Sequence, residues 1–298
     1  MVEIIFLGTG SAIPTRKRSH SSLWLRHESI NMLFDCGEGT QMQIAKAKLN
    51  FMKIDRIFIT HWHADHWAGL IGLIQTMNME GRKRPLYIHG PEADRFVRDI
   101  LDLGYWSVGF PVIPQEVPYE GDDISTVVEE AGFSVTSIPV EHSVPAVSYA
   151  FKVADRWNVD INKAEKLYGL RQGPSVGKLK KNGEIVYRGK KITMKEVGVL
   201  KKGPKIVYSG DTSPCDNVIK IAEGADILIH DSTFFREIED RRHSGAMEAA
   251  EIAKKAGVKK LILTHFSRRY TTTKELEEEA RKMFKNTVAA KDMMTIKV

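Results

Sequence analysis

Short apolar segments alternate with longer amphipathic ones along most of the chain. The short segments are rich in β-branched and aromatic residues, which favour strands, and they predict strands at Ile4–Leu7, Leu23–Leu25, Met32–Phe34, Arg56–Thr60, Leu86–His89, Phe133–Ile138, Ser148–Val153, Ile206–Ser209, Ile227–His230 and Leu261–Thr264. Apolar residues at helical spacing predict helices at Gly39–Lys48, Trp67–Met77, Pro91–Leu103, Asn217–Ala222, Ala246–Ala256 and Lys274–Phe284. Strands and helices that alternate in this way predict an α/β fold.

The alternation is interrupted at about residues 160–204. This region holds Gly169, Gly173, Pro174, Gly177, Gly183 and Gly189, and glycine and proline at this density exclude one continuous helix. We expect a projecting loop or hairpin that interrupts a single domain spanning residues 1–298. The segment Gly104–Gly121 is also rich in proline and glycine, and we expect it to be irregular.

Composition excludes several classes of protein. A hydrophobic fraction of 42% and a charged fraction of 28% in 298 residues are ordinary for a globular protein and exclude fibrous and wholly disordered chains. No apolar run approaches the roughly 20 residues that span a bilayer, and the first residues lack the plan of a signal peptide. Cys36 and Cys215 are the only cysteines, so we expect no disulfide framework and a reducing, cytoplasmic location.

The charge is unevenly distributed. The formal net charge is +6, yet residues 163–205 hold 13 Lys and Arg against 3 Asp and Glu, while the other 255 residues hold 31 against 35. A mildly acidic body therefore carries one strongly basic insert. This asymmetry favours a polyanionic partner, although a lysine-rich loop that is merely solvated has the same composition.

Candidate chemistry begins at His61-Trp62-His63-Ala64-Asp65-His66, directly after the predicted strand Arg56–Thr60. Loop side chains at the carboxyl end of a strand converge on a crevice, and four of these six residues can bind a metal. Imidazole and carboxylate ligands suit Zn²⁺ and are compatible with Mn²⁺ or Fe²⁺. A lone histidine is more often structural, but this spacing predicts a metal site.

Further ligands are expected at other strand ends, because one loop cannot surround two metal ions. His142, Asp211 and His265 each follow a predicted apolar strand. Each of them alone would more often be structural. Their shared position beside the first cluster makes them candidate ligands.

The run HWHADH resembles the HxHxDH signature of the metallo-β-lactamase superfamily, and Asp35 in FDCGEGT resembles its early structural aspartate. The resemblance implies an αββα sandwich with a dinuclear metal site. It implies that one metal binds His61, His63 and His142, that the other binds Asp65, His66 and His265, and that Asp211 bridges them.

Within this superfamily the chain resembles the ribonuclease Z family of tRNA 3′-processing enzymes over nearly its whole length. The resemblance rests on Leu7–Ala12 with Pro14, Thr15 and Arg18, on Asp35–Gln41, on Arg84–Leu86 with Gly90 and Pro91, on Ser148-Tyr149, on Gly173-Pro174 with Gly177–Lys180 and Gly183 in the insert, and on His243-Ser244 and Leu261–Tyr270. Two positions outside the metal loop depart from the family pattern. Asp231 stands where glutamate is usual, which shortens the carboxylate by one methylene, and Gly245 replaces a threonine.

The resemblance implies an endoribonuclease that hydrolyses the phosphodiester at the 3′ end of precursor tRNA, removes the 3′ trailer and leaves a 3′-hydroxyl. The expected cofactors are two Zn²⁺ per subunit, with Mn²⁺ or another divalent metal as alternatives. Asp65 is expected to accept or orient the proton of the attacking water, and His243 to protonate the departing 3′-oxygen while Asp231 holds it. A homodimer is implied, and neither DNA nor a membrane is an expected partner.

The basic insert is expected to be a flexible tRNA-binding arm that recognises shape through phosphate contacts. The expected RNA contacts are Lys178, Lys180, Lys181, Arg188, Lys190 and Lys191 in the arm, and Arg16, Lys17 and Arg18 beside the metal site. Two alternatives stay open: a general phosphodiesterase or hydrolase of small esters or thioesters on the same fold, and a non-catalytic RNA-binding protein.

Overall fold

The structure is a computed structural model that describes residues 1–235 and 242–298. The chain divides into two compact units. The first comprises residues 1–129, 134–151 and 204–298, and the second comprises residues 130–133 and 152–203. The second unit includes the basic insert expected from the sequence. Within the described ranges, no helix combines the length and the apolar character that crossing a membrane requires.

One sheet of the first unit contains most of the N-terminal strands, in the spatial order β18-β1-β2-β3-β4-β5-β6. Its strands are β1 (Val2–Gly8), β2 (Ser22–His27), β3 (Ile30–Phe34), β4 (Ile54–Phe58), β5 (Leu86–Gly90), β6 (Val112–Glu116) and β18 (Thr295–Lys297). Pairing is antiparallel from β18 to β3 and parallel from β3 to β6. The carboxyl ends of β3, β4 and β5 therefore lie at one edge.

The second sheet has the order β17-β16-β15-β14-β9-β8-β7. Its strands are β7 (Ser125–Glu130), β8 (Phe133–Pro139), β9 (Val147–Val153), β14 (Lys205–Tyr208), β15 (Ile227–Asp231), β16 (Leu261–Thr264) and β17 (Thr287–Ala289). The strands β14 to β17 pair in parallel, so the loops after β14, β15 and β16 leave the sheet at the same edge.

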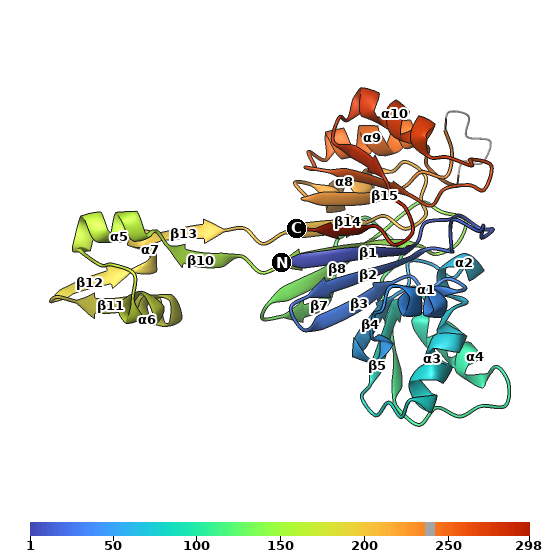
Figure 1. Cartoon of the computed structure of the whole chain (residues 1–298), viewed down its shortest axis with the longest axis horizontal. Coiled ribbons are helices and arrows are strands. Elements are labelled where there is room, and N and C mark those ends of the chain that lie inside the picture. The colour runs from blue at the N-terminus through green and yellow to red at the C-terminus, as the bar shows by residue number, and fades with distance from the viewer. Residues whose placement is uncertain (236–241) are drawn as a thin grey trace. The chain divides into compact units, whose positions relative to one another are not determined.

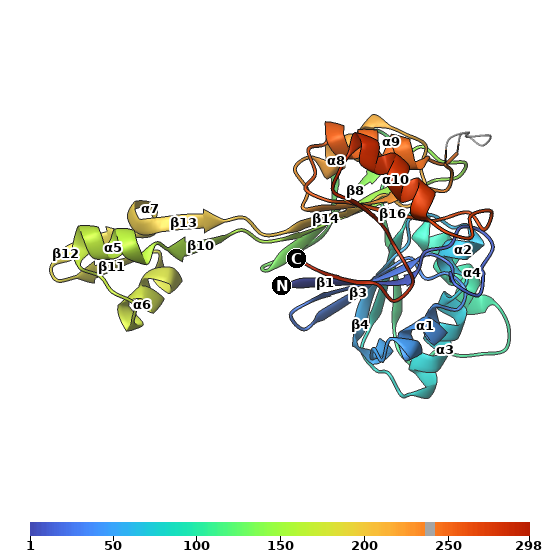
Figure 2. The same cartoon turned by 45° about the horizontal axis from the view of Figure 1, so that its top comes forward.

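The two sheets face each other and helices cover their outer faces (Figures 1 and 2). The helices of the first unit are α1 (Thr40–Lys46), the 3₁₀ helix η1 (Phe51–Lys53), α2 (Ala64–Trp67), α3 (Leu70–Met79), α4 (Ala93–Asp102), α8 (Asp216–Ala222), α9 (Ala246–Lys255) and α10 (Lys274–Met283). Between the sheets, Phe58 stacks on Phe34 with 4.9 Å between ring centroids, and it meets Tyr149 edge-on. The predicted αββα sandwich is confirmed.

Two local expectations for this unit were wrong. The predicted helix Trp67–Met77 is divided into α2 and α3 around Gly69. The chain there passes so close to the Gly37 carbonyl that a Cβ on Gly69 would lie 2.2 Å from that oxygen, so this position requires glycine. The segment Gly104–Gly121 is not wholly irregular, since it contains β6. Pro114 in β6 is tolerated because β6 is an edge strand, whose outward N–H groups need no partner.

The second unit has its own small core instead of the loop or hairpin that we expected. It contains α5 (Ile161–Tyr168), α6 (Pro174–Asn182) and α7 (Met194–Val197), and the strand pairs β10 (Arg156–Val159) with β13 (Gly198–Lys201) and β11 (Glu184–Tyr187) with β12 (Lys190–Thr193). The Asp160 carboxylate caps α5 by accepting from Lys163 N at 3.0 Å. Gly169 and Gly183 end α5 and α6 at φ 63° and 78°, which glycine adopts without strain. Three of the glycines that we took as loop signals, Gly169, Gly173 and Gly183, therefore flank short helices.

Candidate metal centre and active site

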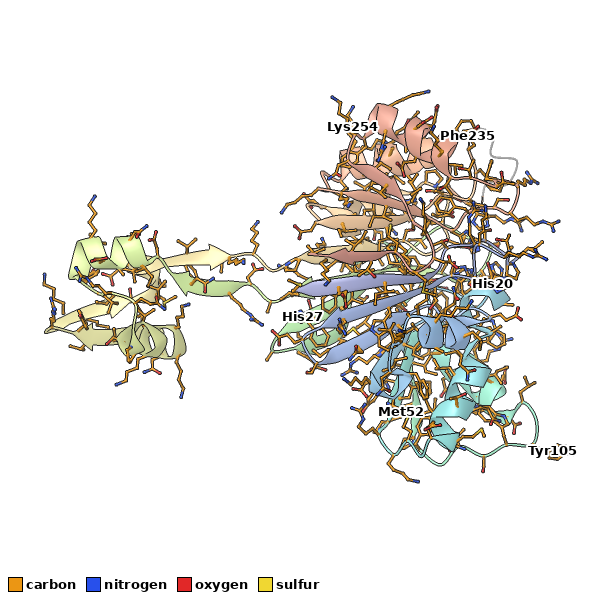
Figure 3. All side chains as sticks on the ribbon, viewed as in Figure 1. His20, His27, Met52, Tyr105, Phe235 and Lys254 are labelled. Carbon is orange, nitrogen blue, oxygen red and sulfur yellow. The ribbon has the colours of Figure 1, made fainter. Side chains whose placement is uncertain are left out.

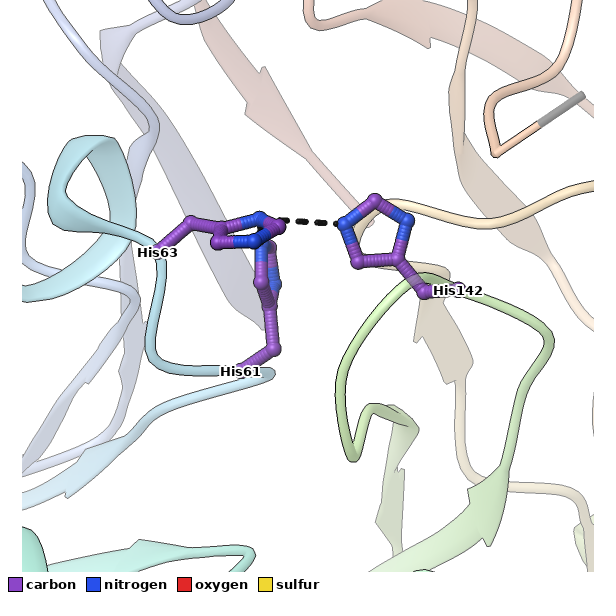
Figure 4. Close-up of side chains that lie close together, drawn as sticks. All are labelled: His61, His63 and His142. Carbon is purple, nitrogen blue, oxygen red and sulfur yellow. Dashed lines mark hydrogen bonds between the residues drawn. The ribbon is translucent and has the colours of Figure 1, made fainter. Parts of the chain in front are cut away.

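Three imidazoles converge in the loops that follow β4 and β8. His61 and His63 follow β4, and His142 lies between β8 and β9. His63 Nδ1 lies 3.0 Å from His61 Nε2 and 3.1 Å from His142 Nε2 (Figure 4). This first cluster contains three of the predicted ligands, and the loops bring them together across the two sheets.

A second cluster lies beside the first one. Asp65, His66, Asp211 and His265 each offer a ligand atom, and these atoms lie within 4.8 Å of one another. Asp211 Oδ2 lies 3.3 Å from His66 Nε2, 3.2 Å from His265 Nε2 and 3.8 Å from His61 Nε2 of the first cluster. All seven predicted ligands therefore meet at one edge of the sandwich, with Asp211 next to both clusters.

The donor arrangement fits bound cations. In the first cluster, His63 Nδ1 faces Nε2 of both His61 and His142. One proton can bridge only one of these two nitrogen pairs at a time, so the other pair is left with facing lone pairs. In the second, Asp211 Oδ1 is buried and has no hydrogen-bond partner within the described ranges. An unpaired buried oxygen and facing lone pairs are costly without a cation. The two His/Asp clusters therefore fit a dinuclear metal site.

The outer nitrogens of the histidines are held by neighbouring groups. His66 Nδ1 donates to Asp35 Oδ2 at 2.7 Å, and His142 Nδ1 donates to the Arg242 carbonyl at 2.8 Å. Thr60 donates to Asp35, which leaves its oxygen to accept from His61 Nδ1 at 3.1 Å. Each contact turns the other ring nitrogen toward the cluster. Asp35 is fully buried and holds His66 and Thr60 through these bonds, which is a structural role.

His243 and Asp231 form a pair at the margin of the second cluster. His243 Nδ1 donates to Asp231 Oδ2 at 3.0 Å, so the shorter carboxylate still reaches the imidazole. Asp231 is fully buried at the end of β15. The start of α9 is also fixed without the usual threonine, because Gly245 N donates to Glu248 Oε2 at 3.0 Å. The two departures from the family pattern thus leave this region well bonded.

Electrostatic effects differ between the histidines. Burial lowers the pKa of His61, and the nearby charge of His66 lowers it further. Burial also lowers the pKa of His243, but the Asp231 carboxylate outweighs this effect and the pKa is raised. At His265 burial again lowers the pKa, yet the carboxylates of Asp211, Asp231 and Asp65 together outweigh it and raise the pKa to about 10. The second cluster therefore has a strong affinity for positive charge.

A pocket of about 350 Å³ opens onto the second cluster. Asp65, Asp211, His243 and His265 form one part of its wall, and Ser11 and Ala12 of the glycine-rich N-terminal loop form another. The Ala12 amide donates to Asp65 Oδ2 at 2.8 Å, so this loop is tied directly to the site.

The predicted RNA contacts have different environments. Arg16 and Lys17 are exposed on the N-terminal loop. The Arg18 guanidinium is bound by its own chain, because it donates to the Tyr270 carbonyl at 2.7 Å and lies over the Phe266 ring. In the second unit, the six predicted lysines and arginines are all exposed, namely Lys178, Lys180, Lys181, Arg188, Lys190 and Lys191.

Several functional neighbours were missed from the sequence. Tyr208 donates to Asp35 Oδ2 at 2.8 Å, and Thr233 donates to Asp231 Oδ1 at 2.6 Å. His20 and Glu38 line the pocket, although no expectation was attached to either. Thr233 lies two residues after Asp231, which the resemblance had singled out, but no local pattern reveals Tyr208 or His20.

The chain is similar to known proteins over its whole length. The family profile described as "Anti-Pycsar protein Apyc1" matches residues 2–160, and the "Beta-lactamase superfamily domain" matches residues 191–266. A protein named Ribonuclease Z from Methanothermobacter thermautotrophicus is 47% identical and aligns with 100% of this chain and 97% of its own. Its namesake from Archaeoglobus fulgidus is 41% identical, with 100% and 98% covered.

Solved structures agree with this similarity. Human tRNase Z, short form, superposes with a TM-score of 0.70 at 27% identity and covers 99% of each chain. The metallo-β-lactamase fold protein YhfI from Bacillus subtilis has a TM-score of 0.69 at 20% identity, with 99% of this chain and 98% of that chain covered. The second likeness concerns the fold alone.

Proposed function

The chain belongs to the ribonuclease Z family, and we propose that it is a metal-dependent endoribonuclease that cuts precursor tRNA at its 3′ end. Hydrolysis of that phosphodiester releases the 3′ trailer and leaves a 3′-hydroxyl on the tRNA. The observation that carries this proposal is one pocket that adjoins a dinuclear donor set and the His243–Asp231 pair. Phosphodiester hydrolysis needs both elements, because it requires an activated water and help for the departing oxygen.

We propose two Zn²⁺ as the cofactors, with Mn²⁺ or another divalent metal as alternatives. His61, His63 and His142 would hold one ion, Asp65, His66 and His265 the other, and Asp211 would bridge them. The imidazole-rich donor set supports zinc, and the position of Asp211 beside both clusters supports the bridge. When bound, such ions lower the pKa of water and neutralise negative charge at phosphorus.

The side chains of the chain itself would control the protons. Asp65 Oδ2 already accepts from the Ala12 amide at 2.8 Å, which fixes a carboxylate where it can orient the attacking water. His243 donates from Nδ1 to Asp231, so its Nε2 is the atom that can pass a proton to the departing 3′-oxygen. Asp231 holds the imidazole in that orientation and stabilises its protonated form.

The second unit is proposed as the tRNA-binding arm. The six predicted RNA contacts lie on α6, on β12 and in the turn between β11 and β12. Contacts between lysine or arginine and phosphate recognise the shape of a folded RNA without reading its sequence. Arg16 and Lys17 would guide the acceptor stem from the margin of the pocket. Action as a homodimer in the cytoplasm stays a prediction.

The proposal is tested with a precursor tRNA that carries a 3′ trailer. The purified protein is stripped of metal, supplied with Zn²⁺, Mn²⁺ or Mg²⁺, and the product ends are mapped. We expect one cut after the discriminator nucleotide and a 3′-hydroxyl on the tRNA.

The matched variants are His63→Ala and His27→Gln. His20 lines the pocket at the metal ligands, and His27 lies at the end of β2 far from His20 (Figure 3). Only the first variant should therefore lose cleavage. If no metal supports cleavage by the unaltered protein, the proposed function is wrong. If His63→Ala cleaves as well as the unaltered protein, the metal assignment is wrong.

A further inference from the structure

The pocket is also lined by a histidine and a glutamate that the proposed reaction does not use. His20 is 6% exposed, and its Cβ packs so closely on Gly37 that a Cβ added there would lie 2.5 Å away. Glu38 follows Gly37 directly, and its side chain is 74% exposed. His20 and Glu38 line the same pocket as Asp65, Asp211 and His243. The pocket is thus lined by the reactive groups and, in addition, by this pair, which we call the His20 wall.

The hydrogen bonds of His20 determine what it can offer to a ligand. Its Nε2 lies 3.1 Å from the Ala12 carbonyl oxygen, and a carbonyl can only accept, so Nε2 carries the proton. In the neutral imidazole Nδ1 is then an acceptor. This Nδ1 is buried and has no hydrogen-bond partner among residues 1–235 and 242–298. A buried polar atom without a partner is unusual and calls for a ligand or a water.

The position of Glu38 adds a second acceptor to the first. Its Oε2 lies 3.9 Å from His20 Nδ1, and an ionised carboxylate also only accepts. Two acceptors side by side fit a ligand that donates a hydrogen bond. Phosphate diesters have no donor, so this wall is not a phosphate site. In RNA the available donors are the ribose 2′-hydroxyl and the N–H groups of the bases, which are the exocyclic amines and the ring N–H of guanine and uracil.

The ribose hydroxyl is favoured over a base amine. Every ribonucleotide has a 2′-hydroxyl at the same place on its backbone, whereas the N–H groups lie at different positions on the four bases. A site that needed one of these N–H groups would therefore favour some bases over others. The pocket is about 350 Å³ and also borders the reactive groups, which places a nucleotide that flanks the scissile phosphate against the His20 wall. The 2′-hydroxyl is also the group by which proteins distinguish RNA from DNA.

We propose that His20 Nδ1 and the Glu38 carboxylate accept the 2′-hydroxyl of the nucleotide next to the scissile phosphate, and that they thereby select RNA over DNA. This inference rests on the proposed function of the same site. Neither side chain takes part in bond cleavage, so both are specificity residues. Glu38 supplies the charge of the contact, and the buried His20 supplies its direction.

The test combines enzyme variants with single-atom changes in the substrate. Precursor tRNAs carry one 2′-deoxynucleotide, either just before or just after the cut, and kcat/KM is measured against the all-ribose precursor. The deoxy change also alters the intrinsic reactivity of the bond. The informative quantity is therefore the ribose-to-deoxy ratio of each variant compared with that ratio for the unaltered protein.

We expect Glu38→Ala to lower this ratio by about 10-fold at one of the two positions, which is the usual effect of one hydrogen bond to a charged group. Glu38→Gln, which keeps one acceptor, should give an intermediate ratio, and His20→Gln should lower it as well. Glu120→Ala, at an exposed acidic residue that does not line the pocket, should keep the ratio of the unaltered protein.

The outcomes separate the inference from the proposed function. Equal ratios in the unaltered protein and in all Glu38 and His20 variants, at both positions, would overturn the inference while all-ribose cleavage continues. A purine riboside in place of adenosine tests the base amine, and a response of the variants to that change alone would also overturn it. Absence of cleavage of the all-ribose precursor by the unaltered protein would instead refute the proposed function.

Discussion

The role of His243 as the proton donor can be tested by its removal. His243→Ala takes away a side chain that is 16% exposed and that is held by the 3.0 Å bond to Asp231. A positioned general acid contributes about 10²- to 10⁴-fold to a rate. We therefore expect kcat for precursor tRNA to fall by roughly 100-fold or more, with little change in RNA affinity, because the imidazole is assigned to the chemical step.

Asp231→Asn should produce a smaller effect of the same kind. Asp231 accepts from Thr212 N, Ser244 N and His243 through Oδ2, and from the amide and hydroxyl of Thr233 through Oδ1. An asparagine has one acceptor oxygen and no charge. The lost charge-assisted bond amounts to about 1.5–3 kcal/mol, which corresponds to a decrease of about 10- to 150-fold in kcat. The buried site should also lose thermal stability.

Leaving-group dependence is the decisive assay for this pair. A ribose 3′-oxygen needs a proton as it departs, whereas a nitrophenolate leaves without one. Both variants should therefore hydrolyse a bis-nitrophenyl phosphodiester at nearly the rate of the unaltered protein. If both substrates slow by the same factor, His243 supports the metal centre or the fold instead, and our assignment of a general acid is refuted.

Three further predictions follow from other parts of the structure. Burial lowers the pKa of His89 to about 3, below the value of about 6.5 in an unfolded chain. Below pH 6.5 the unfolded chain therefore binds a proton that the folded protein does not, so the folded protein loses stability as the pH falls. Between pH 7.5 and 5 the unaltered protein should lose about 2 kcal/mol more unfolding free energy than His89→Leu, measured by urea denaturation. Gly37→Ala would put a Cβ 2.2 Å from the Asp65 carbonyl oxygen, so we expect weaker metal binding by calorimetry and a lower melting temperature, and normal values for both would contradict the geometry. Residues 156–201 can be replaced by two glycines, because β10 and β13 already bring the two ends of this segment together. This deletion should abolish high-affinity precursor tRNA binding in filter assays and preserve nitrophenyl phosphodiester hydrolysis. Unchanged tRNA affinity would exclude the second unit as the arm.

Much of the site could be predicted because its signals are local. HWHADH follows a strand, and His142, Asp211 and His265 each follow another, so the topology of parallel strands was enough to expect their convergence. The structure brings the corresponding atoms together in two clusters. Helix and strand positions in the first unit agree closely with the apolar pattern for the same reason, since burial of one face is recorded in the order of residues.

The second unit illustrates what a local pattern misses. Its glycines were interpreted as signs of a loop, because φ/ψ freedom is the same at a turn and at the end of a helix. A small core that includes Val159, Ala164 and Leu179 decides between these possibilities, and it forms only when segments distant in the sequence pack together. The hydrogen bond of Tyr168 also joins residues that are distant in the sequence, because its hydroxyl donates to Glu196, 28 positions further along the chain, at 3.0 Å.

The sequence alone therefore determined the candidate ligand types, their strand-end positions, the α/β class and the basic insert, because each depends on residue chemistry or on short-range periodicity. The αββα sandwich was implied by the family resemblance. Only the tertiary structure decided which groups orient one another. It directs Arg18 toward its own backbone, lets the shorter Asp231 reach His243, and leaves a buried nitrogen of His20, a residue of the pocket lining, without a hydrogen-bond partner among the described residues. These contacts join residues far apart along the chain, and their ångström-scale distances depend on how the two sheets and their loops pack.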